Sequence, residues 1–145
     1  MILPDLNLLL YAYNPHAPQH ARAKAWWESA INGRELIGLP HEVTLGFVRI
    51  ATNPRLGAAA VPLSAAQAVV EGWLKIPVVR VLLPQEDHVV KVMALMERSA
   101  TSGQLASDAS LAVYAIESRA TLCSNDSDFA RFSGLTWKNP LLQVA

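Results

Sequence analysis

The chain has 145 residues, of which 52% are hydrophobic and 17% are charged, a composition that excludes a disordered protein and indicates a globular one. The length favours a single domain covering residues 1–145. Twelve acidic and twelve basic residues balance, which argues against a protein that coats nucleic acid with a basic surface. A compact nucleic-acid site in which a metal supplies the positive charge remains compatible with this balance.

The first half of the chain alternates short apolar runs with helical patterns. In chain order we predict a strand at residues 2–4, a helix at 6–13, an amphipathic helix at 23–30 ended by 32–33, a second strand at 35–39, and a helix that has Pro40 in its first turn and breaks at 53–55.

The second half continues the alternation. It contains a helix at 65–73 with Ser64 as its cap, a strand at 78–83, a helix at 86–100, a helix opened by Asp108, a strand at 121–124, a short helix at 126–132 and a last strand at 135–138. Short apolar strands separated by helices favour a mainly parallel sheet covered on both faces, so the predicted fold is a three-layer α/β/α sandwich.

We expect a cytoplasmic protein without a membrane segment. Residues 1–5 lack the basic region of a signal peptide, and the apolar stretch 6–13 is far too short to span a bilayer. The single cysteine, Cys123, cannot form an internal disulfide and lies in an apolar run, which predicts a buried structural thiol.

Four acidic residues lie near strand-to-helix junctions of this scheme, namely Asp5, Glu42, Asp108 and Asp126. In open parallel sheets, functional sites collect outside the carboxyl ends of the strands, so these four side chains could meet at one edge. Each residue taken alone also has an ordinary explanation, because acids stabilise helix starts by capping and by interacting with the helix dipole.

Carboxylates that converge in this way require a cation or raised pKa values. Two of them about 4 Å apart repel each other by ~4 kcal/mol at an effective dielectric constant of about 20. Hard oxygen ligands without thiolate or histidine favour Mg²⁺ or Mn²⁺. A water held by such a metal is a ready nucleophile, which indicates hydrolytic phosphoryl transfer.

Four stretches, in order along nearly the whole chain, resemble the motifs of PIN domains, and of the VapC-like toxins in particular. They are Asp5-Leu-Asn7 with the apolar helix after it, Glu42 with Phe47-Val-Arg49-Ile and Thr52-Asn-Pro54, Asp108-Ala-Ser-Leu-Ala112, and Ser124-Asn-Asp126-Ser-Asp128-Phe with Trp137-Lys-Asn-Pro140. Ser107 and Ser110 depart from the pattern, because bulkier residues or histidine are common at these two positions.

The resemblance implies an endoribonuclease toxin that uses Mg²⁺ or Mn²⁺, cleaves tRNA or ribosomal RNA, forms a homodimer and is inhibited by a cognate antitoxin whose tail covers the active site. By motif position the catalytic and metal-binding residues would be Asp5, Glu42, Asp108 and Asp126, with Asp128 as an auxiliary metal ligand. The same resemblance, together with helical spacing, suggests Asn7, Arg49 and Ser124 as substrate-binding residues.

Two other classes of protein fit parts of the pattern. A non-catalytic PIN-like module that binds protein or RNA has the same fold but no need for four acids. A receiver-like phosphoacceptor domain has an acidic pocket, but it requires a lysine at a loop, and Lys138 lies within a predicted strand. The four histidines lack the spacing of metal ligands, and the four tryptophans are predicted in the core or at a dimer interface.

Overall fold

The structure, a computed structural model, describes residues 1–142, and its central feature is a five-stranded sheet. The strands are β1 (Ile2–Pro4), β2 (Ile37–Pro40), β3 (Val79–Leu82), β4 (Thr121–Cys123) and β5 (Trp137–Lys138). Every pairing between them is parallel. The α/β class is therefore confirmed, and the sheet of the described chain is parallel throughout.

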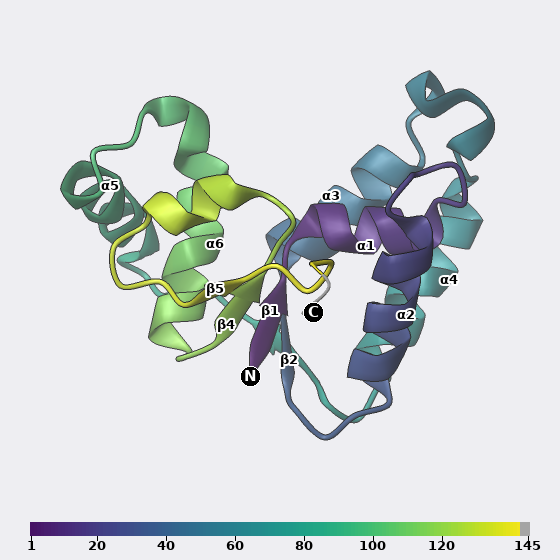
Figure 1. Cartoon of the computed structure of the whole chain (residues 1–145), viewed down its shortest axis with the longest axis horizontal. Coiled ribbons are helices and arrows are strands. Elements are labelled where there is room, and N and C mark those ends of the chain that lie inside the picture. Colours follow the sequence, from purple (N-terminus) through teal and green to yellow (C-terminus); the bar gives the residue numbers. More distant parts are fainter. Residues whose placement is uncertain (143–145) are drawn as a thin grey trace.

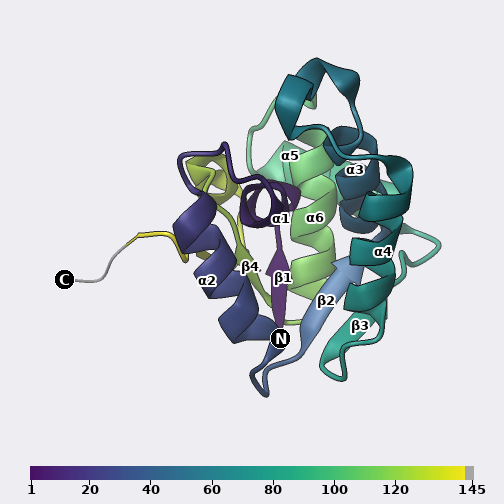
Figure 2. The ribbon, with the colours of Figure 1, turned by 90° about the vertical axis from the view of Figure 1, so that its right-hand side faces the viewer.

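Helices cover both faces of this sheet. They are α1 (Leu6–Tyr13), α2 (His20–Ile31), α3 (His41–Ala51), α4 (Leu63–Leu74), α5 (His88–Arg98) and α6 (Ala106–Glu117), with the short 3₁₀ helices η1 (Pro54–Ala59), η2 (Gly103–Leu105) and η3 (Ser127–Arg131). Figure 1 shows α1, α2, α3 and α4 on one side of the strands and α5 and α6 on the other, and Figure 2 looks onto the four-helix side.

In the strand order β3-β2-β1-β4-β5 the chain adds strands first on one side of β1 and then on the other, so the strand order reverses between β1 and β4. The chain moves outward from β1 to β2 and β3, and then returns to β4 on the other side of β1. Pro4 and Cys123 are register partners, so both strands end at the same level. In sheets of this kind the crevice at the reversal of strand order is the usual ligand site.

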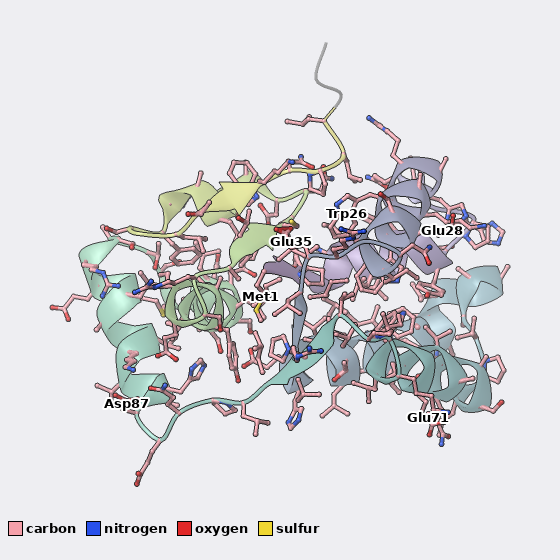
Figure 3. The ribbon with its side chains drawn as sticks, turned by 90° about the horizontal axis from the view of Figure 1, so that it is seen from below. Met1, Trp26, Glu28, Glu35, Glu71 and Asp87 are labelled. Carbon is pink, nitrogen blue, oxygen red and sulfur yellow. The ribbon has the colours of Figure 1, made fainter. Side chains whose placement is uncertain are left out.

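The opposite edge of the sheet carries the amino ends of the strands. Seen from below in Figure 3, Met1 and Glu35 lie near each other at this edge, with 4.0 Å between the terminal ammonium group and the Glu35 carboxylate. This edge is remote from the carboxyl ends of β1 and β4, where the predicted acids lie.

Aromatic side chains form the centre of the core on the four-helix side. Trp27 and Trp73 are each 2% exposed, and their rings meet edge to face at 5.7 Å. Phe47 packs against Trp73 at 4.8 Å, and Trp73 donates its indole hydrogen to the Tyr13 hydroxyl at 2.9 Å. The four tryptophans are predicted in the core or at a dimer interface; Trp27 and Trp73 belong to the core, while Trp26 and Trp137 are half-buried.

Three of the six buried residues of α6 are alanine. Ala109, Ala112 and Ala115 are completely buried, and α6 packs on β4 and against α5. Cys123 is also buried, and burial raises the pKa of its thiol to about 11, which agrees with a structural thiol.

Three predicted helix starts differ from the structure. Pro40 ends β2 as the partner of Leu82 and precedes α3, because its extended conformation suits a strand end as well as an N-cap. Helix α4 begins directly after Pro62, so Ser64 is already inside it. Helix α6 begins at Ala106, because η2 leads straight into it, and this places Asp108 in the first turn.

The predicted strand at 135–138 is shorter in the structure, where β5 contains only two residues. Within residues 1–142 no helix combines the length and the apolar character that a membrane span requires.

Candidate active site

Asp5 follows β1 directly and lies at the switch point of the sheet. Its amide donates to the Cys123 carbonyl at 2.8 Å, which ties it to the end of β4. The side chain is only 6% exposed, although it is acidic. Asp5 occupies the N-cap position of α1, and the backbone amides of Leu6 and Asn7 are close enough to lower the pKa of its carboxyl, although neither makes a capping hydrogen bond of good geometry. Burial has the larger effect and raises this pKa, so interaction with the helix start does not compensate the carboxylate fully.

Ser124 is the partner of Asp5. Its hydroxyl is fully buried, donates to Asp5 Oδ2 at 2.8 Å and accepts from the Asp126 amide at 2.9 Å. The sequence suggests Ser124 as a substrate-binding residue, but a buried hydroxyl with both contacts occupied cannot reach RNA. Its role in the structure is to orient Asp5 and the loop that carries Asp126.

Asp126 has a structural role with one of its oxygens. Oδ1 accepts from the Asp128 amide at 2.9 Å and thereby caps η3. The Asp128 carboxylate lies 3.4 Å from the Arg131 guanidinium on the same short helix. Asp128 therefore already has a positive partner, whereas no ion pair is found for Asp126 among the described residues.

Asp108 is brought to the same region by the first turn of α6. Burial, and then the negative charges of Asp5, Asp126 and Asp128, raise the pKa of Asp108 to about 6. The pKa of Asp5 is also raised, chiefly by burial, against the opposing hydrogen bond from Ser124 and together with the charge of Asp126. These mutual effects place four aspartates within electrostatic reach of one another.

Glu42 approaches from the first turn of α3. The Ser110 hydroxyl donates to Glu42 Oε1 at 2.9 Å, so this carboxylate is held by α6 and not by its own helix. Tyr114 lies one turn further along α6. Burial, and then the charge of Glu42 and a hydrogen bond to it, raise the pKa of the Tyr114 hydroxyl to about 12.

A cavity of about 300 Å³ joins three of these acids. It is lined by Asp5, Leu6, Asn7, Glu42, Val43, Arg49, Ser107, Asp108 and Leu111. A neighbouring hollow of about 290 Å³ contains Asp126 and is lined by Asn7, Tyr11, Asn125, Asp126 and Ser127. Asn7 borders both spaces, and Arg49 is the only basic residue lining either of them in the described chain.

The residues predicted from the sequence thus lie together at one sheet edge, with Asp128 at its margin. Sequence reasoning did not find the contacts of Glu42 with Ser110 and Tyr114. Ser110 and Tyr114 are four residues apart on one helix, and this spacing is only a weak indication of a shared partner, because any two residues so spaced lie on the same helix face.

The donor set fits a hard divalent cation. Within residues 1–142 no three side chains from His, Cys, Asp or Glu are already gathered as a closed set of ligands. Mg²⁺ does not require such a cage, since it keeps several of its waters and is usually held by one or two carboxylates. Carboxylates whose pKa values are raised by burial and by neighbouring negative charges, as for Asp5 and Asp108, are the groups that a cation would stabilise in ionised form.

Comparisons with known proteins agree with this geometry. The family model described as PIN domain matches residues 2–135. Ribonuclease VapC33 of Mycobacterium tuberculosis is 45% identical over 97% of this chain and 99% of its own length.

Two solved structures share the fold. VapBC2 of Rickettsia felis, bound to a DNA fragment from its promoter, has a TM-score of 0.69 at 18% identity and covers 96% of this chain and 98% of its own. VapC20 of M. tuberculosis, described as a Sarcin-Ricin loop cleaving toxin, has a TM-score of 0.69 at 21% identity and covers 94% of this chain and 99% of its own. The chain belongs to the PIN-domain family and, within it, to the VapC endoribonucleases, the toxins of toxin–antitoxin pairs.

Proposed function

We propose that this endoribonuclease depends on Mg²⁺ or Mn²⁺ bound by the acids of the cavity, with Asp5 and Asp108 as the principal ligands. The observation that carries the proposal is geometric: Asp5, Glu42 and Asp108 line one cavity at the carboxyl ends of the strands, and Asp5 is only 6% exposed. Burial, and then the charges of Asp5, Asp126 and Asp128, raise the pKa of Asp108, which agrees with this placement. A bound cation would offset the repulsion among these carboxylates and favour their ionised forms.

The remaining side chains have supporting roles in this proposal. Asp126 and Glu42 complete the site or orient waters, and Asp128 contributes to the negative potential while it pairs with Arg131. Arg49, across the cavity, is suited to bind an RNA phosphate or a carboxylate of an antitoxin tail. When bound, a divalent cation supplies Lewis acidity to the phosphodiester and lowers the pKa of a coordinated water.

The proposed substrate is a structured RNA, either tRNA or ribosomal RNA, cleaved to leave 5′-phosphate and 3′-hydroxyl ends. The description of VapC20 as a toxin that cleaves the sarcin–ricin loop supports a ribosomal target for a protein of this fold. We propose further that a cognate antitoxin inhibits the chain by covering the cavity; the likeness of the fold to that of the VapBC2 structure supports an antitoxin partner.

A homodimer is also part of the proposal. Apolar side chains that are each between 47% and 66% exposed follow one another along β3 and into α5, namely Val81, Leu83, Val89, Val90 and Met93. A run of exposed apolar groups of this kind is typical of an interaction surface. Light scattering after size-exclusion chromatography would give twice the chain mass for a dimer, and a monomeric mass would contradict this part.

The metal proposal is tested with the purified chain and a structured RNA. Cleavage should require Mg²⁺ or Mn²⁺ and stop with a chelator. Asp5→Asn should abolish cleavage and bind Mn²⁺ more weakly by calorimetry, while thermal unfolding remains cooperative. Glu71→Gln is the control, since Glu71 is an exposed acid on α4, labelled in Figure 3, and it should behave as wild type. Full activity of Asp5→Asn would refute the assignment.

A further inference from the structure

A chain of side-chain hydrogen bonds leads from the α5–α6 contact to Glu42. His88, the first residue of α5, places its Nε2 atom 2.8 Å from the Ser110 hydroxyl oxygen. The Ser110 hydroxyl lies in turn 2.9 Å from Glu42 Oε1. His88 is only 8% exposed, whereas Glu42 is exposed. The chain therefore connects a buried ring on one helix to an exposed carboxylate on another.

The donors and acceptors along this series of hydrogen bonds determine which ring nitrogen of His88 carries the hydrogen. A serine hydroxyl has one proton, and an ionised carboxylate can only accept, so Ser110 donates its proton to Glu42. The Ser110 oxygen must then accept from His88, which requires a hydrogen on Nε2. His88 Nδ1 is buried and has no hydrogen-bond partner in the described chain. A ring with its hydrogen on Nε2 alone makes both hydrogen bonds possible, from His88 to Ser110 and from Ser110 to Glu42. It also leaves no buried N–H without an acceptor.

Tyr114 belongs to the same arrangement. Its ring packs on the His88 ring at 4.5 Å between centroids with a tilt of 38°, and its hydroxyl is near enough to Glu42 for that carboxylate to raise its pKa. Ser110 and Tyr114 are four residues apart on α6, so both hydroxyls lie on the side of the helix that faces Glu42. His88 touches both of them, one through a hydrogen bond and the other through ring contact.

We propose that His88 is a positioning residue of the active site, which orients the Ser110 hydroxyl and thereby holds the Glu42 carboxylate toward the cavity. This inference rests on the proposed function, because it assigns a purpose to the placement of Glu42. An exposed glutamate has several rotamers, and fixing one of them costs entropy at each turnover unless other groups hold it beforehand. A hydrogen on His88 Nε2 occupies the Ser110 oxygen as acceptor and leaves the hydroxyl proton directed at Glu42.

Two substitutions separate the hydrogen bond from the bulk of the ring. His88→Gln can place its amide nitrogen near the position of Nε2 and keep a donor to Ser110. His88→Asn has a similar polarity, but its shorter amide reaches only about the position of Nδ1. We expect His88→Asn to lower kcat about tenfold with KM within about twofold of wild type, and His88→Gln to retain most of kcat.

A double-mutant cycle tests whether His88 acts through Ser110. Ser110→Ala should lower kcat as His88→Asn does, and the double variant should be no slower than Ser110→Ala alone. A double variant whose loss of kcat equals the product of the two single losses would overturn the proposal. A wild-type kcat for His88→Asn would overturn it as well. Thermal unfolding of each variant shows that it is folded before kinetics are compared.

A second readout does not depend on RNA cleavage. Long-range proton–nitrogen NMR spectra of the metal-free protein should show His88 as the tautomer with hydrogen on Nε2. In Glu42→Ala the Ser110 hydroxyl no longer donates to a carboxylate and can donate to Nε2 instead, so we expect the preference for hydrogen on Nε2 to weaken measurably. A ring with its hydrogen on Nδ1 in the wild type would overturn the proposal. If the wild type failed to cleave RNA with any divalent metal, the proposed function would fail, and these spectra would still decide whether the hydrogen-bond chain exists.

Discussion

Ser124 donates its hydroxyl proton to the Asp5 carboxylate at 2.8 Å, and this bond crosses the sheet at the point where its winding reverses. The two residues follow Cys123 and Pro4, which are register partners in β4 and β1. Parallel pairing therefore sets the distance between a buried acid and the hydroxyl that satisfies it. The same hydroxyl accepts from the Asp126 amide, so one serine links two of the four acids.

Removal of this hydroxyl should affect both folding and activity. We expect Ser124→Ala to lower the free energy of unfolding by ~1–3 kcal/mol, because a buried carboxylate and a backbone amide both lose a partner. RNA cleavage should fall as well, since Asp5 is no longer oriented. Urea denaturation and initial cleavage rates measure the two effects. Ser124→Thr keeps the hydroxyl and should recover most of both, whereas an alanine variant as stable and active as wild type would contradict this role.

The sequence was sufficient to predict the sheet-edge site because strand ends can be recognised locally. Asp5 comes directly after one short apolar run and Asp126 three residues after the end of another, and parallel strands bring their carboxyl ends to one edge. Asp108 was expected at the first residue of its helix and lies instead in the first turn. This shift does not remove it from the site, because the first turn still faces the same edge.

The surroundings of Glu42 could not be predicted in the same way. The distance from His88 to Ser110 depends on how α5 packs against α6, and nothing local in either helix specifies that packing. His88 has no ligand spacing with another histidine, so the sequence gives it no role. The role that we propose for His88 follows from the hydrogen-bond partners of its two ring nitrogens in the folded protein.

The stability of the metal-free protein should depend on the protonation of Asp108. Its pKa of about 6 in the folded state lies above the ordinary value of 3.8, so the folded protein binds more protons than the unfolded chain between these pH values. The free energy of unfolding should therefore decrease as the pH rises from about 4 to about 6, and the penalty should persist above that range.

The variant Asp108→Asn isolates this effect. Its gain in unfolding free energy over wild type should be absent near pH 4, grow up to about pH 6 and then remain constant, as measured by urea denaturation with a chelator present. A difference that is independent of pH would show that Asp108 does not titrate in this range. In the wild type, Mn²⁺ affinity should weaken below about pH 6, because protons compete for the same carboxylate.

Asp126 and Asp128 should differ in their importance although they are two residues apart. Asp128 pairs with Arg131, and its charge has the smallest effect among those that raise the pKa of Asp108. The charge of Asp126, in contrast, raises the pKa of Asp5 as well. We expect Asp126→Asn to reduce cleavage at least about tenfold and Asp128→Asn to reduce it only a few-fold. Asparagine preserves the cap of η3 at position 126, so both variants should fold. Equal losses of activity would assign Asp128 to the metal as well.

Two helical glycines provide a test of how tightly the cavity wall is packed. A methyl group added at Gly72 in α4 would meet nothing within 4 Å, so Gly72→Ala should stabilise the protein by ~1 kcal/mol through helix propensity alone. This variant is the reference.

The same change at Gly46 in α3 would place its Cβ 2.8 Å from Leu6 Cδ2. Leu6 lines the cavity beside Asp5 and would have to move. We therefore expect Gly46→Ala to gain less stability than Gly72→Ala and to cleave RNA more slowly, as thermal unfolding and cleavage rates of the pair would show. If both variants gained equally and cleaved at the wild-type rate, the contact between α3 and Leu6 would have no part in shaping the site.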